Sequence, residues 1–112
     1  MKHSFLDDMQ ASYLEAAFFT DTDDIENPEF TKLFQAQAYF ACVRFEDAAR
    51  YLDINLRDLY SADQLGHDLW FTRNRHGVGF WDRPEVYGDH KDIFTAFARA
   101  QGEHDVEFEV TK

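Results

Sequence analysis

The residues best suited to chemistry in this chain are concentrated in one stretch, Gly66–Arg83, which reads GHDLWFTRNRHGVGFWDR and is called the central segment below. It contains both tryptophans of the chain, two of its five histidines and three of its five glycines. Histidine and aspartate together can do general acid–base chemistry, and arginine and tryptophan are frequent in recognition surfaces. The remainder of the chain is acidic and rich in phenylalanine, so this composition stands out.

Catalysis would require some of these side chains to converge, and their spacing argues against it. His67 and Asp68 are adjacent, so on a helix they diverge by roughly 100° and do not orient one another. Thr72 and Ser61 lack the strand–turn–helix elbow that exposes a nucleophile, and Cys42 lies beside an apolar helical stripe where a buried thiol is expected. We therefore expect no catalytic residue. The alternative is a small enzyme or ligand-binding module whose pocket is formed by His67, Asp68, Arg73, His76 and Asp82.

A metal site has equally little support in the spacing of the possible ligands. No two histidines stand four residues apart, as the two ligands of a helical zinc motif do, and the chain has a single cysteine. The sequence thus predicts neither a bound metal nor another cofactor.

Two interpretations of the central segment remain open. In the first, Arg73 and Arg83 form planar pairs with Asp68 or Asp82, and the segment is a polar scaffold that holds the fold together. In the second, the segment recognises a partner, because tryptophan and arginine often dominate interfaces. The candidate binding residues of the chain are Trp70, Arg73, Arg75, His76, Trp81, Arg83, Asp105, Glu107 and Glu109.

The net charge restricts the class of partner. With 22 acidic residues against 11 Lys and Arg, the formal charge is −11, which repels phosphate backbones and argues against direct binding to nucleic acid. Asp105, Glu107 and Glu109 would lie about 7 Å apart along one face of a strand. That spacing is close to the distance between phosphates, so the acids either imitate DNA toward a basic protein or are simply solvated.

The periodicity of apolar residues outlines the elements that must position these side chains. Ser4 with Asp7, and Ser61 with Gln64, resemble capping boxes at helix starts. Helices are expected at about 5–18, from Asn27-Pro28-Glu29 to about 51, as a short turn within 53–60, from 61 to about 74, and from Gly88-Asp89 to Gly102.

Two strands are also expected. Gly77–Arg83 is short and aromatic, and 106–110 alternates Val106, Phe108 and Val110 with acids. The predicted fold class is therefore α+β, with several helices packed on a small antiparallel two-stranded sheet. Residues 1–112 are expected to form one domain, without a membrane span and located in the cytoplasm.

The central segment resembles a family of small proteins of bacteriophages and phage-derived islands that carry the sequence GHDFWLTRNGHGAGFWDRG. The shared residues are Gly66, His67, Asp68, Trp70, Thr72, Arg73, Asn74, His76, Gly77, Gly79, Phe80, Trp81, Asp82 and Arg83. The departures are Leu69, Phe71, Arg75, Val78 and Pro84. Weaker similarity covers 13–19 and Asp89 to Phe108. The resemblance implies a phage-type accessory protein that acts inside a bacterial host, and it implies no mechanism.

Together these observations predict a non-enzymatic, acidic accessory protein that binds another protein. The expected partner is a host defence or DNA-processing protein with a basic surface, which the chain would inhibit. A homodimer that buries the excess phenylalanines against a second copy is the remaining alternative.

Overall fold

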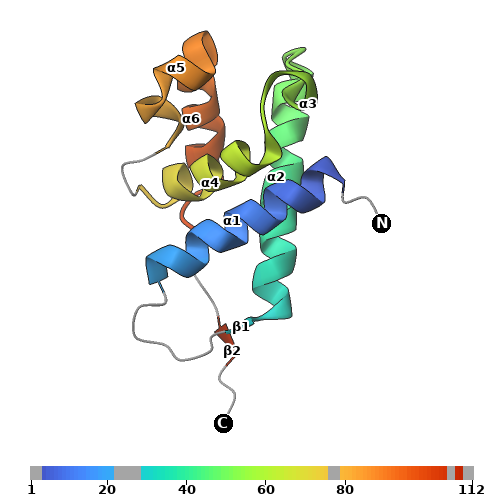
Figure 1. Cartoon of the computed structure of the whole chain (residues 1–112), viewed down its shortest axis with the longest axis vertical. Coiled ribbons are helices and arrows are strands. Elements are labelled where there is room, and N and C mark those ends of the chain that lie inside the picture. The colour runs from blue at the N-terminus through green and yellow to red at the C-terminus, as the bar shows by residue number, and fades with distance from the viewer. Residues whose placement is uncertain (1–3, 22–28, 76–78, 106–107, 110–112) are drawn as a thin grey trace.

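The computed structural model describes residues 4–21, 29–75, 79–105 and 108–109. Its α-helices are α1 (Phe5–Asp21), α2 (Lys32–Tyr51), α3 (Leu56–Leu59), α4 (Ala62–Arg73), α5 (Pro84–Tyr87) and α6 (Lys91–Ala100). The 3-10 turns η1 (Phe80–Asp82) and η2 (Gly88–His90) flank α5. Figure 1 shows α1 crossing the long α2, with α4 beside α1, and with α6 and α5 on the other side of α4.

The α+β prediction is wrong, because the described chain is mostly helical. Its β structure is confined to the two-residue segments β1 (Glu29–Phe30) and β2 (Phe108–Glu109), which pair antiparallel in the register Glu29↔Glu109 and Phe30↔Phe108. Two residue pairs offer no face on which helices can pack. Figure 1 places β1 and β2 at one end of the molecule, where Phe30 of β1 stacks on Phe34 of α2 with ring centroids 5.0 Å apart.

The helix boundaries agree with the capping signals in most places. Ser4 and Asp7 bond reciprocally at the start of α1, with Asp7 N donating to Ser4 Oγ over 3.0 Å. Ser61 Oγ likewise accepts from Gln64 N at the start of α4. Helix α2 ends at Tyr51 as expected, but it starts later than Asn27 predicts. Glu29 and Phe30 belong to β1, so the helix can begin only after them. Its N-cap is Thr31, whose Oγ1 accepts from Phe34 N.

The expected strand at Gly77–Arg83 is also wrong where the structure describes it. From Phe80 the chain forms η1 and then α5, whose first residue is Pro84. The reason is local: the backbone N–H of Phe80 donates to Thr72 Oγ1 over 3.1 Å, and that of Gly79 donates to Asp82 Oδ2. Side chains thus satisfy the amides that a neighbouring strand would otherwise bind.

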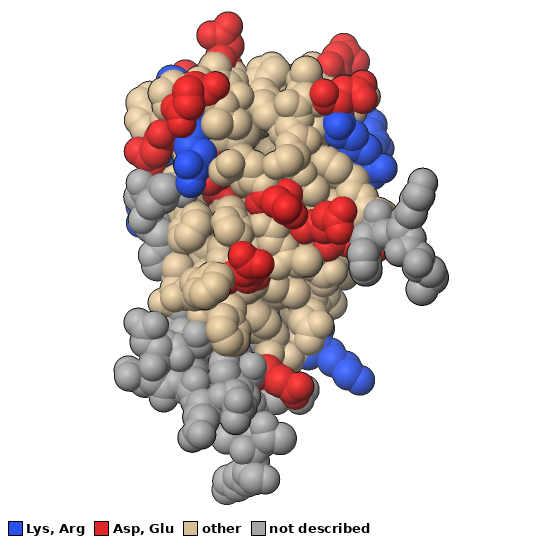
Figure 2. All heavy atoms as spheres, viewed as in Figure 1, with Lys and Arg blue, Asp and Glu red and all other residues tan. Residues whose placement is uncertain are grey.

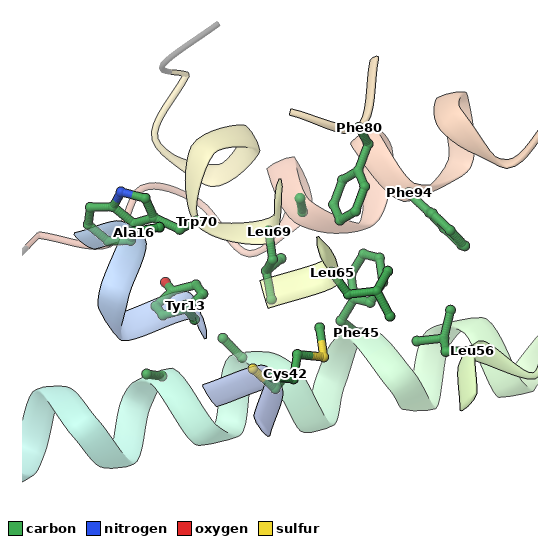
Figure 3. Close-up of a cluster of buried hydrophobic side chains, with 14 of the residues drawn as sticks. Tyr13, Ala16, Cys42, Phe45, Leu56, Leu65, Leu69, Trp70, Phe80 and Phe94 are labelled. Atoms are coloured by element: carbon green, nitrogen blue, oxygen red, sulfur yellow. The ribbon is translucent and has the colours of Figure 1, made fainter. Parts of the chain in front are cut away.

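One hydrophobic core joins the helices, and Figure 3 shows part of it. Phe45 of α2 stacks on Phe80 of η1, with ring centroids 5.1 Å apart, and Phe94 of α6 meets both rings edge to face. Cys42 of α2 is buried in this core as its position beside the apolar stripe predicts, and burial raises the pKa of its thiol to about 12. This thiol is therefore protonated and unreactive at neutral pH.

The close contact between α1 and α4 depends on Gly66. A Cβ atom at this position would overlap the carbonyl oxygen of Met9 and would lie 2.9 Å from both Ser12 Cβ and Tyr13 N. Next to it, Ser12 Oγ donates to the carbonyl oxygen of Asp63 over 2.5 Å. The glycine of the central segment therefore lets α4 lie directly against the backbone of α1.

Candidate functional site

The first polar cluster of the central segment is centred on Asp68, which is fully buried on α4. Arg83 Nε donates to its Oδ1 over 2.9 Å, while Gln64 Nε2 and the Tyr87 hydroxyl donate to Oδ2 over 2.8 and 2.5 Å. The hydrogen bond to the Asp68 carboxylate raises the pKa of Arg83. Burial, together with the hydrogen bond from its hydroxyl to Asp68, raises the pKa of Tyr87. Each oxygen of Asp68 is therefore occupied, and the cluster ties α4 to α5.

The second polar cluster is centred on Arg73 at the end of α4, which is only 8% exposed. Its Nη1 donates to the Tyr13 hydroxyl over 3.0 Å, its Nε to the Gly102 carbonyl over 2.9 Å and its Nη2 to the Gln101 carbonyl over 3.2 Å. These bonds connect α1, α4 and the turn after α6.

His104 extends the Arg73 cluster, and the hydrogen bonds define its tautomer. Because Gln37 Oε1 can only accept, His104 Nε2 carries the proton of the neutral ring and donates to it over 3.0 Å. His104 Nδ1 then accepts from the Tyr13 hydroxyl over 2.7 Å, while the same hydroxyl accepts from Arg73. Burial, assisted by the charge of Arg73, lowers the pKa of His104 to about 4, so the ring is neutral at pH 7.

The expected pairing of an arginine with Asp68 is thus present, and the other candidate residues of the central segment divide by exposure. Trp70 is buried, and its Nε1 donates to Thr20 Oγ1 over 3.1 Å. Arg75 is exposed with a positive φ of 57°, in the turn that ends α4. His76 lies outside the described residues.

Asp105, Glu107 and Glu109 were expected to form a strand ladder, and the structure describes only part of it. Asp105 is exposed and precedes β2, and Glu109 pairs through its backbone with Glu29. Glu107 lies outside the described residues. The relative positions of the three carboxylates therefore stay a prediction.

Trp81 is the large aromatic of the central segment that reaches the surface, with 57% of its area exposed. Lys91 Nζ lies over its ring, 4.1 Å from the centroid. Beside it is a hollow of about 410 Å³, called the Trp81 hollow below, which is lined by Trp81, Asp92, Thr95, Ala96 and Arg99. Two of the lining residues, Thr95 and Ala96 of α6, have small side chains.

The side chains proposed for the alternative enzyme do not converge where the structure describes them. His67 Nε2 lies 3.5 Å from Glu15 Oε1 on α1, Asp68 is enclosed by its three donors, and Asp82 accepts from the amide of Gly79. They are engaged in separate pairs on different elements, which is the arrangement expected of a scaffold.

Several residues of these clusters were missed in the sequence. Gln64 and Tyr87 hold Asp68, and Tyr13, Gln101 and His104 surround Arg73. Their separations in the chain follow no repeating spacing, so no pattern could have found them. Glu46 was missed too, although its position four residues before Arg50 is typical of a helical ion pair. It is buried and receives two bonds of 2.9 and 3.0 Å from Arg57, which lower its pKa.

Comparisons with protein-family models, with curated proteins and with solved structures each give no match. Within the described residues, no three His, Cys, Asp or Glu side chains are grouped so that they could hold a metal ion. None of the helices in that part of the chain is both long and apolar enough to cross a membrane.

Proposed function

We propose that this protein acts by binding another protein, which presents a basic surface and inserts an apolar side chain into the Trp81 hollow. The observation that supports this most directly is the exposure of Trp81 at 57% beside a hollow of about 410 Å³. Leu69, Trp70 and Phe80 of the central segment are buried in the core, and Asp68, Arg73 and Arg83 are bonded in the two polar clusters. A tryptophan that the fold leaves exposed is a strong anchor for a partner.

The charges around Trp81 favour a basic partner. Asp82, Glu85 and Asp89 are exposed on η1, α5 and η2, close to the indole in sequence, and Asp92 lines the hollow. Among the nearby cations, Arg83 is bonded to Asp68 and Lys91 pairs with Asp92 over 3.1 Å. Arg99 lines the hollow itself, so four acids stand against three cations around the indole. Negative charge around an apolar hollow complements an apolar side chain flanked by Lys or Arg.

The wider surface supports the same class of partner. Residues 5–31 include no Lys, Arg or His and carry many acids. Figure 2 shows acidic side chains over the face on which α1 and α4 lie, with Lys and Arg toward its edges. Such a surface attracts proteins that normally hold DNA or RNA, so the proposed role is that of a phage-type inhibitor of a host defence or DNA-processing protein in the bacterial cytoplasm.

The test is capture of partners from bacterial lysate at low and high salt, with three forms of the tagged protein. Wild type should retain a stoichiometric basic protein at low salt and lose it at high salt. Ala96→Arg should lose the partner at low salt, because the new side chain fills the Trp81 hollow and repels a basic surface. The matched control is Ala100→Arg, at another exposed position of α6 that does not line the hollow, and it should retain the partner.

Two results would contradict the proposal. The first is the absence of any specific partner at both salt concentrations. The second is equal capture by Ala96→Arg and wild type, which would show that the partner does not use the Trp81 hollow.

A further inference from the structure

A second hollow, of about 340 Å³, lies on a different part of the molecule and does not depend on the proposed partner. Gln37, Phe40 and Arg44 of α2 line one side of it. Arg73 and the chain that follows α6, with Gln101, Glu103 and His104, line the rest. We call it the Arg73 hollow.

Arg73 is a buried cation whose partners are all neutral. It bonds to one hydroxyl and two backbone carbonyls, and no described carboxylate lies within 4 Å of its guanidinium. A buried charge without a counter-charge is energetically unfavourable. An anion bound next to Arg73 would therefore stabilise the protein. These three hydrogen bonds occupy three of the five guanidinium N–H groups, which leaves two as donors for such an anion.

Arg44 adds a second positive charge to the Arg73 hollow. Its side chain is exposed and makes no ion pair with any carboxylate of the described residues. Glu103, which is also exposed, is the acid of the lining, so the lining holds two guanidinium groups and one carboxylate. On a chain of net charge −11, a hollow with a local excess of positive charge is an unusual place.

The Arg73 hollow also contains an acceptor without a donor. Gln101 Nε2 donates to the Ala41 carbonyl over 3.1 Å, which fixes the orientation of the amide, and its Oε1 is buried with no hydrogen-bond partner. A buried unpaired acceptor is unfavourable, so an N–H group of an occupant that reaches this oxygen would be stabilising. Phe40, 58% exposed on α2, supplies an apolar wall beside these polar groups.

We propose that the Arg73 hollow binds a carboxylate with a neighbouring amide N–H, the chemistry of an N-acylated amino acid. The carboxylate would lie against Arg44 and the free N–H groups of Arg73, since guanidinium and carboxylate match in shape and charge. The amide N–H would donate to Gln101 Oε1, and the side chain of the ligand would pack on Phe40. A free small molecule and the C-terminal residue of a peptide both carry this group.

The test is titration of the full chain with N-acetylphenylalanine, followed by NMR or calorimetry. Saturable binding is expected, and both the methyl ester and 3-phenylpropionate should bind at least about tenfold more weakly, because each lacks one of the two recognised groups. Binding of the ester as tight as that of the acid would overturn the proposal, as would the absence of saturable binding.

Two variants with the same change of charge locate the binding. Arg44→Gln should weaken the affinity for N-acetylphenylalanine about tenfold or more. Because the Arg44 side chain is exposed, the variant should keep the fold, and its thermal unfolding curve checks this directly. Arg75→Gln removes another exposed arginine that does not line the Arg73 hollow, and it should bind as wild type does. Equal affinities of these two variants would overturn the assignment to this hollow.

The source of the ligand is distinguished with an acetylated tripeptide that ends in phenylalanine. Binding at least as tight as that of N-acetylphenylalanine, lost when the C-terminus is amidated, supports a peptide terminus. Binding about tenfold weaker supports a small molecule, since the added residues would then find no room.

Discussion

At the scale of single residues, the buried polar side chains of the central segment hold neighbouring elements together through hydrogen bonds. Arg83 and Asp68 hold α5 on α4, and Arg73 joins Tyr13 to the turn after α6. The spacing of these residues predicted ion pairs with Asp68, and that expectation is confirmed for Arg83. It gave no indication that Arg73 would be held by a hydroxyl and two carbonyls, because those partners are 60 and 28 or 29 residues away in the chain.

The buried histidine makes stability depend on pH. The pKa of His104 is about 4 in the folded protein and 6.5 in an unfolded chain. Between these values the unfolded state binds more protons, so the free energy of unfolding falls as the pH is lowered from about 6.5 toward 4, by about 3 kcal/mol for this group. We expect urea unfolding to show this loss in wild type and a smaller one in His104→Gln.

The control for this prediction is His67→Gln, which removes a histidine on α4 that lies outside the Arg73 cluster. It should keep the pH dependence of wild type. If His104→Gln also keeps it, protonation of His104 does not weaken the fold.

At the scale of elements, the contact between α1 and α4 is the most demanding one in the fold. Gly66 allows it, and Trp70 and Leu69 follow on the same helix and enter the core (Figure 3). The helices themselves were largely predictable, since their capping residues and apolar spacing are local features. The strand prediction at Gly77–Arg83 failed because an aromatic run such as 79–83 has the same composition in a strand and in a short helical turn, and the hydroxyl of Thr72 selects the turn. The described β2 lies within the strand expected at 106–110.

Substitution of Gly66 by alanine should destabilise the protein despite the better helix propensity of alanine. The added methyl group overlaps the Met9 carbonyl, which is backbone and cannot rotate away, so α1 and α4 must separate. Overpacking of this kind costs about 1–3 kcal/mol, against a gain in propensity of up to about 1 kcal/mol. Urea unfolding should therefore show a net loss.

Ala36→Gly, at an exposed position of α2, measures the propensity difference between the same two residues in this protein. Adding this loss to the net loss of Gly66→Ala isolates the cost of the contact at Gly66. A Gly66→Ala variant as stable as wild type would mean that the helices separate without loss.

At the scale of the whole molecule, the composition gives the net charge of the protein but not the positions of its charged side chains. The excess of acids is plain from the sequence, but their relation to Trp81 and to the Arg73 hollow depends on the packing of α2, α5 and α6. Neither hollow has a signal in the sequence, because each is lined by residues of separate elements. The fold class could not be predicted from the sequence either, since two short strands and many helices are compatible with several arrangements.

The contribution of the C-terminal acids to partner binding can be tested by charge reversal. Replacing Asp105, Glu107 and Glu109 with lysine should weaken the affinity for a captured basic partner and reduce the dependence of that affinity on salt. Titration at two salt concentrations measures both effects. Unchanged affinity would mean that this stretch is not part of the contact.

A variant with lysine at Glu15, Asp47 and Asp58 gives the same change of net charge on α1, α2 and α3. It separates the general effect of charge from a local one. If both triple variants weaken binding equally, only the overall charge matters at these six positions.

The two tryptophans occupy opposite environments, and this has a practical consequence for spectroscopy. Trp70 is enclosed in the core with its N–H bonded to Thr20, whereas the ring of Trp81 is in contact with water and with the ammonium of Lys91. Intrinsic fluorescence should therefore contain two components, a blue-shifted one shielded from iodide and a red-shifted one that iodide quenches. The first reports unfolding and the second reports occupation of the neighbouring surface, so a single unlabelled sample can separate the loss of structure from the arrival of a partner.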